Sequence, residues 1–189
     1  MDHKESSKQT SDLTSIIILN YNAGDLLLDC IESVFKTQNR KIEVIVVDNI
    51  SADYSHIKCK KQFPNIRLIE NNENLGYCEG NNVGIRAATG DFVVILNPDT
   101  KVEPDWLIEL FNSYETNGDG LYQPKILAFN NNLFESGGNM LQVFGFGYSK
   151  GREIQDDGQY DEFCEIGYAS GACLFTKTEI IKKIGLFDP

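Results

Sequence analysis

Polar side chains follow four short apolar runs of this sequence, at the points where buried strands would end. These polar segments are residues 20–22, 48–53, 70–74 and 97–99. In open α/β sheets, ligands bind beyond the carboxyl ends of the strands. Carboxylate and amide groups at such an edge can bond the hydroxyls of a ribose and can hold a hard cation beside phosphate oxygens. The spacing therefore predicts one polar rim built from four strand ends.

Three aspartates of this rim are candidate functional groups, each with a simpler alternative. Asp48 directly follows the apolar residues 44–47, where its carboxylate could accept bonds from a ribose or a base, or could form an Asx turn. For Asp53, capping of the next helix is at least as good an explanation. Asp99 is the natural position for a divalent cation, although turn preferences alone favour a plain loop carboxylate by roughly two to one.

Glycines and histidines add little that is specific. Gly76, Gly80 and Gly84 could let the backbone approach a ligand closely, but their spacing matches neither a dinucleotide fingerprint nor a P-loop. His3 lies in the polar leader, and His56 is predicted on an exposed helix. No Ser/His/Asp or Cys/His triad can be assembled, which disfavours hydrolase chemistry.

The elements that position the rim alternate regularly. Short apolar runs at residues 15–19, 44–47, 66–69 and 92–96 predict buried strands, and helical spacing follows at 26–35, 53–63 and 82–88. Strands that are apolar on both faces and alternate with helices are typical of a parallel sheet covered on both sides. The fold class is therefore α/β, with a mostly parallel, Rossmann-like sheet flanked by helices.

The pattern changes after Asn97. Pro104 opens a helix that runs through Phe111, short antiparallel strands are expected after residue 118, and Ile180 begins a last amphipathic helix. Aromatic side chains in this half could stack on a sugar, but burial habits favour a core position by about three to one. These are Trp106, Tyr122, Phe144 and Tyr148.

Composition limits the function classes. A length of 189 residues with 41% hydrophobic content fits one domain, predicted at 14–189 after a disordered leader at 1–13. The net charge of −11, without a basic cluster, argues against nucleic acid as a partner. The apolar runs are too short for a membrane span. Five cysteines without a CxxC pair favour a reducing cytosol over a disulfide framework or zinc site.

Several motifs occur together in a fixed order along residues 14–189. They are IIILNYN at 16–22, VVDNISAD at 46–53, NLG at 74–76, NNVGI at 81–85, LNPD at 96–99, GACLF at 171–175 and GLFD at 185–188. Jointly these motifs resemble the family 2 glycosyltransferases of the GT-A fold, and most closely a rhamnosyltransferase-like branch. The joint pattern is far more specific than any single motif.

The resemblance implies inverting transfer of a sugar, with rhamnose as a candidate, from a UDP or dTDP donor to an acceptor hydroxyl in polysaccharide or cell-surface glycan synthesis. Mn²⁺ or Mg²⁺ would bind the diphosphate at Asp99, which matches the last acid of the DxD-type motif whose first acid is replaced by Asn97. Gly171 and Ala172 would border the acceptor. The nucleotide would contact Asn20, Tyr21, Asn22, Asp48, Asn74, Gly76 and Asn97.

The resemblance also places the catalytic base beyond Pro189, so we expect a domain incomplete at its C-terminus that binds donor and transfers sugar poorly or not at all. The main alternative is a non-catalytic, degenerate nucleotide-sugar-binding module. A nucleotidyltransferase is disfavoured because residues 20–24 contain no basic side chain. The expected location is the cytoplasm, with peripheral contact at the inner face of the membrane for a glycan or lipid-linked acceptor. A homodimer stays an open option.

Overall fold

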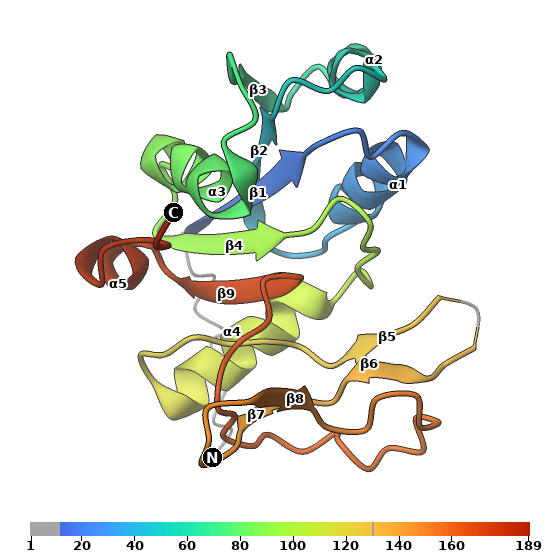
Figure 1. The fold of residues 1–189 in the computed structure, drawn as a ribbon, viewed down its shortest axis with the longest axis vertical. Coiled ribbons are helices and arrows are strands. Elements are labelled where there is room, and N and C mark those ends of the chain that lie inside the picture. The colour runs from blue at the N-terminus through green and yellow to red at the C-terminus, as the bar shows by residue number, and fades with distance from the viewer. Residues whose placement is uncertain (1–11, 130) are drawn as a thin grey trace, which may run out of the picture.

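A computed structural model of the chain describes residues 12–129 and 131–189 (Figure 1). Most of the predicted leader, residues 1–11, lies outside the described part, and the first strand already begins at Leu13. A five-stranded sheet has the order β3-β2-β1-β4-β9. Its strands are β1 (Leu13–Asn20), β2 (Lys41–Asp48), β3 (Arg67–Glu70), β4 (Phe92–Leu96) and β9 (Cys173–Lys177). The first four are mutually parallel and β9 is antiparallel to β4, as the fold class predicts.

Apolar side chains on both faces of the strands explain why the sheet is central. On β1, Ile16 and Ile18 face one layer while Ile17 faces the other, and all three are fully buried. Successive strand residues point to opposite faces, so a continuous Ile/Val run needs cover on both sides. Burial of each such side chain is worth about 1.5–3 kcal/mol.

Helices supply that cover. The first face packs against α1 (Asp25–Val34), α2 (Ser55–Gln62) and α4 (Trp106–Asn117), which contribute among others Leu27, Cys59 and Phe111. The second face packs against α3 (Gly76–Ala87) and α5 (Thr178–Lys183) through Ile85 and Ile181. The domain is thus a three-layer α/β/α arrangement.

Helix α3 begins at Gly76, so its predicted start at residue 82 is wrong. The prediction failed because Asn and Gly residues at the helix start are typical of turns. Two of its glycines lie against strands and away from the pocket: a Cβ on Gly80 would lie 2.6 Å from Leu19 Cδ1, and one on Gly84 would collide with Ile17. Small residues at these positions let α3 lie directly on β1 and β2.

Short antiparallel strands form a separate layer below the sheet, as predicted after residue 118 (Figure 1). They are β5 (Ile126–Leu127), β6 (Phe134–Ser136), β7 (Asn139–Leu141) and β8 (Gly147–Ser149). Of the aromatic residues expected in the core, Trp106 and Tyr122 are buried, but Phe144 is 86% exposed and Tyr148 is exposed as well. Phe144 lies in the turn between β7 and β8, where its neighbours Val143 and Phe146 are exposed as well.

Candidate functional site

The carboxyl ends of the parallel strands meet at one edge, as the sequence predicts. Asn20 at the end of β1 is the register partner of Asp48 at the end of β2, and Asp48 pairs in turn with Glu70 on β3. A cavity of about 450 Å³ opens at this edge. We call it the strand-end pocket, and it is lined by Leu19, Tyr21, Ala23, Leu26, Asn49, Asn74, Gly76, Tyr77, Asn97, Pro98 and Asp99.

Five of the residues predicted to bind nucleotide or metal line this pocket together. They come from three different loops and are Tyr21, Asn74, Gly76, Asn97 and Asp99. Gly76 has a positive φ of 71° at the first residue of α3, a conformation that favours glycine. The walls of the pocket combine amide groups, one carboxylate and aromatic rings, the mixture that small-molecule sites commonly use.

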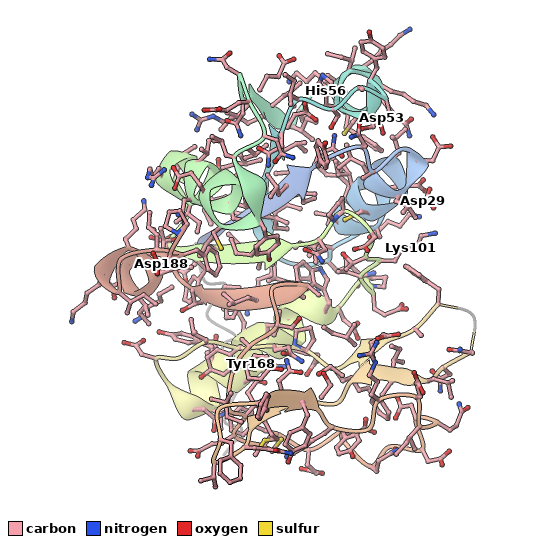
Figure 2. The ribbon with its side chains drawn as sticks, viewed as in Figure 1. Asp29, Asp53, His56, Lys101, Tyr168 and Asp188 are labelled. Carbon is pink, nitrogen blue, oxygen red and sulfur yellow. The ribbon has the colours of Figure 1, made fainter. Side chains whose placement is uncertain are left out.

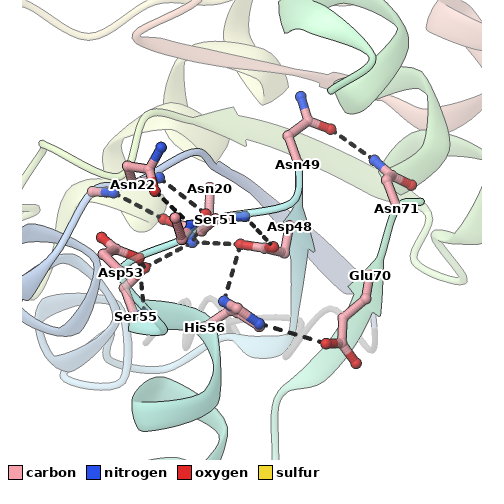
Figure 3. A network of polar contacts seen from close by, with 12 residues as sticks. Asn20, Asn22, Asp48, Asn49, Ser51, Asp53, Ser55, His56, Glu70 and Asn71 are labelled. Carbon is pink, nitrogen blue, oxygen red and sulfur yellow. Dashed lines mark hydrogen bonds and ion pairs between the residues drawn. The ribbon is translucent and has the colours of Figure 1, made fainter. Parts of the chain in front are cut away.

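Asn20 and Asp48 lie behind the pocket wall rather than in it. Asn20 is fully buried and Asp48 is 2% exposed. The Asn20 amide Nδ2 lies 2.7 Å from Asp48 Oδ1, 3.0 Å from Ser51 Oγ and 2.9 Å from Ser55 Oγ, and the Ser51 N–H donates to Asp48 Oδ2 at 2.9 Å (Figure 3). In this arrangement their polar groups hold the loop after β2 in place.

Asn22 and Asp53 join the loops that follow β1 and β2. Asn22 Oδ1 accepts the Ala52 N–H at 2.8 Å, and Asp53 Oδ2 accepts the Gly24 N–H at 2.8 Å. Asp53 Oδ1 also accepts from the Ser55 N–H at 3.0 Å, which is an Asx-type bond in the turn before α2, because the N-cap residue of that helix is Tyr54 and no side chain caps it. Its small burial works against the charged form, but the bonds from Ser55 and Gly24 outweigh it and lower the pKa of the Asp53 carboxyl.

Sequence reasoning missed two residues of this region. Asn49 lines the pocket, and its Nδ2 donates to Asn74 Oδ1 at 3.1 Å and to the Gly76 carbonyl at 3.0 Å. Its position directly after Asp48 was the available signal. His56 was predicted on an exposed helix, yet it is only 7% exposed and contacts Asp48 (Figure 3). The eight-residue helix α2 is too short and polar for its buried face to be predicted from periodicity.

A cation at the pocket would find few protein ligands. Asp99 is exposed. Asn97 is fixed through its backbone N–H, which donates to the Ala172 carbonyl at 3.0 Å. Among the described residues there is no group of three His, Cys, Asp or Glu side chains arranged to hold a metal. One carboxylate with an amide oxygen nearby fits a Mg²⁺- or Mn²⁺-type ion that is bound mainly by substrate phosphates and water.

Basic charge also lies close in sequence to Asp99. The Lys101 ammonium, two residues further along, pairs with Asp29 of α1 at 2.8 Å, and Figure 2 shows both at the α1 side of the sheet. Both side chains of this ion pair are about half exposed. Exposed pairs of this kind contribute about 0–1 kcal/mol, so the contact orients the loop more than it stabilises it.

The predicted acceptor-side residues border the pocket through Tyr77. The Tyr77 hydroxyl donates to the Gly171 carbonyl at 2.7 Å, and a Cβ on Gly171 would collide with that hydroxyl. Ala172 is tied to the loop of Asn97 by its carbonyl. Burial raises the pKa of the Tyr77 phenol to about 12, so it stays a neutral hydrogen-bond donor. Residues 171 and 172 therefore lie next to two lining residues, Tyr77 and Asn97, without lining the pocket themselves.

A pocket at the carboxyl ends of a mostly parallel, two-sided sheet is typical of open α/β domains, and the structural neighbours of this domain are GT-A-like. Solved structures share this arrangement. The mannosyltransferase PcManGT from Pyrobaculum calidifontis, in complex with GDP-Man and Mn²⁺, superposes with a TM-score of 0.65 at 19% identity, over 93% of this chain and 47% of that one. S. aureus TarS 1–349 in complex with UDP-GlcNAc gives 0.66 at 15% identity, over 93% and 48%.

The chain belongs to glycosyl transferase family 2, whose family model matches residues 15–185. Similar curated proteins include the glycosyltransferase GlyG of Streptococcus pneumoniae, 29% identical over 56% of this chain and 36% of that protein. The low-salt glycan biosynthesis hexosyltransferase Agl10 of Haloferax volcanii is 30% identical over 61% and 37%. The matched region spans about a third of the length of these relatives. In the described residues no helix is long and apolar enough to cross a membrane.

Proposed function

We propose that the strand-end pocket binds the nucleoside diphosphate of a sugar donor, of the UDP or dTDP type, for inverting transfer to an acceptor hydroxyl. The observation that carries this proposal is the convergence of Asn49, Asn74, Gly76, Asn97 and Asp99 on one cavity of about 450 Å³ at the strand ends. Amide donors and acceptors there suit a base and a ribose. TarS with UDP-GlcNAc and PcManGT with GDP-Man share the fold, which supports a ligand of this class.

Asp99, with the amide oxygen of Asn97, would hold a Mn²⁺ or Mg²⁺ ion on the diphosphate. Such an ion offsets the negative charge that grows on a leaving diphosphate. The residues of this chain would supply the rest: Asn49 and Asn74 orient the nucleoside, and Tyr21 covers one side of the pocket. The complex of PcManGT with GDP-Man and Mn²⁺ supports a divalent ion as a cofactor of this chain.

We propose a hexose as the transferred sugar, with rhamnose as the first candidate because of the motif resemblance, and a glycan or lipid-linked saccharide as acceptor. Relatives named for succinoglycan and low-salt glycan biosynthesis support such an acceptor. All five cysteines lie in the described part and are free thiols, which fits a reducing compartment such as the cytoplasm, with the acceptor presented at the inner face of the membrane. Gly171 and Ala172 would face that acceptor.

A second candidate, a nucleotide-sugar-binding module without catalysis, is favoured by one observation. Among the described residues that line the pocket, Asp99 is the only carboxylate. Direct displacement needs a general base within hydrogen-bond reach of the acceptor hydroxyl, and Asp99 is assigned to the cation. Binding of donor and transfer of sugar therefore have to be measured separately.

Calorimetric titration of UDP, dTDP and GDP, each with and without Mn²⁺, tests the site. We expect one nucleotide to bind, and Mn²⁺ to strengthen its binding. Asp99→Ala should remove the effect of Mn²⁺ and leave the weak metal-free binding, whereas Asp105→Ala, an exposed carboxylate outside the pocket, should change neither. The proposed function would be refuted if none of the three nucleotides bound to the chain. Turnover of a donor by the chain would refute the non-catalytic alternative.

A further inference from the structure

The aromatic ring of Tyr77 belongs to the wall of the strand-end pocket, while its hydroxyl is bonded within the protein. The residue lines the pocket and is 40% exposed. Its hydroxyl donates to the Gly171 carbonyl at 2.7 Å. Because the polar end of the side chain is engaged in this bond, the surface that Tyr77 offers to a ligand is the apolar ring.

Contacts around Tyr77 fix the position of its ring. The rings of Tyr77 and Phe187 lie edge to face, with their centroids 6.2 Å apart. Asn82 of α3 holds Phe187 by a pair of bonds, because its Nδ2 donates to the Phe187 carbonyl at 2.9 Å and its Oδ1 accepts the Phe187 N–H at 3.0 Å. A Cβ on Gly171 would collide with the Tyr77 hydroxyl, so glycine leaves room for the bond. A ring fixed before binding loses little conformational entropy when a ligand packs on it.

The strand order locates Tyr77 relative to the proposed nucleotide. Along the sheet the order is β2, β1, β4 and β9 (Figure 1). Asn49 follows β2 and Asp99 lies just after β4, whereas Gly171 precedes β9 by two residues. Since β9 is antiparallel to β4, its first residues lie beside the carboxyl end of β4. A donor with its nucleoside at Asn49 and its diphosphate at Asp99 therefore directs its sugar toward β9, where the Tyr77 hydroxyl ends.

A sugar ring is a suitable partner for an aromatic ring at this position. One face of a pyranose consists mainly of C–H groups, and the face of an aromatic ring carries a partial negative charge that attracts them. The amide of Asn97 and the carboxylate of Asp99, which line the same pocket, can bond hydroxyl groups and a cation. The pocket thus combines an apolar surface for a sugar face with polar groups for its edges.

We propose that the Tyr77 ring is the stacking surface for the transferred sugar, which makes Tyr77 a specificity-determining residue of the donor site. The inference rests on the proposed function, because it names the sugar-binding part of the same pocket. The bond to Gly171 and the contact with Phe187 orient the ring. Tyr77 should therefore contribute to the binding of a nucleotide sugar and contribute little to the binding of a nucleoside diphosphate.

The test compares UDP with UDP-glucose, and dTDP with dTDP-rhamnose, by calorimetric titration in the presence of Mg²⁺. Tyr77→Leu keeps an apolar side chain and removes the ring. We expect it to weaken binding of the nucleotide sugar about fivefold more than binding of the matching diphosphate, the size of one aromatic contact. Tyr77→Phe keeps the ring and should lose less than half as much. Tyr148→Leu is the matched control and should change neither affinity, because Tyr148 of β8 is 47% exposed and lies outside the pocket.

The inference would be overturned if Tyr77→Leu weakened the diphosphate and the nucleotide sugar equally or left both unchanged. An equal loss in Tyr77→Phe would assign the effect to the hydroxyl and would overturn it too. It would also fail, with nucleotide binding left intact, if the wild type bound a diphosphate and neither nucleotide sugar. If the wild type bound none of the four ligands, the proposed function itself would fail.

A measurement on the wild type covers the case in which Tyr77→Leu does not fold. In the complex with the nucleotide sugar, NMR should show intermolecular NOEs between protons of the sugar and protons of the Tyr77 ring. Tyr77→Phe assigns the ring signals, because it removes the tyrosine resonances of this residue alone. NOEs from the sugar to other residues and none to Tyr77 would overturn the inference.

Discussion

Glu43 and Asp48 are carboxylates at opposite ends of β2, and their surroundings assign them different tasks. Asp48 lies at the carboxyl end, buried against Asn20 and His56 beside the pocket. Glu43 lies near the amino end, where its Oε1 accepts from the Ser15 hydroxyl and from the Thr89 N–H at 2.8 Å. The first belongs to the functional edge, and the second joins β1, β2 and the turn before β4.

Glu43 should make stability depend on pH in the acid range. Burial disfavours its charged form, but the hydrogen bonds from Ser15 and Thr89 outweigh burial and lower the pKa of the carboxyl below its ordinary value of 4.5. A folded-state pKa below the unfolded one means that the stabilisation is present above about pH 4.5 and is lost as the pH falls through the folded value. Urea unfolding at pH 7 and at pH 3 should show this loss as a lower free energy of unfolding at pH 3.

In that experiment Glu43→Gln should lower the free energy of unfolding at pH 7, and the difference from wild type should shrink toward pH 3. Glu103→Gln replaces an exposed carboxylate and should give a small difference at both pH values. A Glu43→Gln effect of equal size at pH 7 and pH 3 would contradict the assignment of the bonds to the ionised form.

At the scale of elements, α3 shows how close packing replaces helix propensity. Glycine costs about 1 kcal/mol relative to alanine inside a helix, yet Gly84 stands in the middle of α3. An added Cβ would collide with Ile17 of β1 and lie 3.2 Å from Val47 of β2. We therefore expect Gly84→Ala to destabilise the fold by about 1–3 kcal/mol despite its better propensity.

The control for this substitution is Gly120→Ala. Gly120 does not have a positive φ, and a Cβ there would meet the Tyr122 ring at an ordinary 3.6 Å. Its effect on the midpoint of urea unfolding should be close to neutral or slightly stabilising. Equal midpoints for Gly84→Ala and wild type would show that the contact of α3 with β1 and β2 is looser than described.

Prediction from the sequence succeeded where the local pattern is strong and failed where tertiary packing decides. The buried strands, the helices between them and the pocket position of Asn74, Gly76 and Asp99 follow from apolar runs and strand ends. His56 was misplaced because a polar helix of eight residues carries no clear hydrophobic periodicity. Phe144 was misplaced because an aromatic residue usually signals a core, and only the fold shows that it lies in an exposed hairpin turn.

At the scale of the whole molecule, the reactivity of the cysteine thiols can be used to measure opening of the hydrophobic core. Cys30, Cys59 and Cys173 are buried in one hydrophobic cluster, and burial raises the pKa of each thiol to about 12. Cys164 is exposed and Cys78 is half-buried. Because the thiolate is the reactive form, buried neutral thiols should be modified only when the domain unfolds.

We expect Ellman's reagent at pH 8 to modify Cys164 at once and Cys78 more slowly, with Cys30, Cys59 and Cys173 reacting at the rate of global opening. Cys164→Ser should remove the fast phase alone. The opening free energy from the three slow thiols should agree with that from urea unfolding. Rapid modification of more than two thiols in the native protein would contradict the single cooperative core.

Tyr122 and Phe175 exchange both backbone hydrogen bonds, at 2.8 and 2.9 Å, on the outer side of β9. The segment between Tyr122 and the start of β9, residues 123–172, therefore leaves and rejoins the sheet at neighbouring points. Doubling the length of a closed loop adds only about 0.6 kcal/mol of closure entropy. A change in the length of this segment should therefore cost the domain little stability, provided that Gly171 and Ala172 keep their bonds to Tyr77 and Asn97.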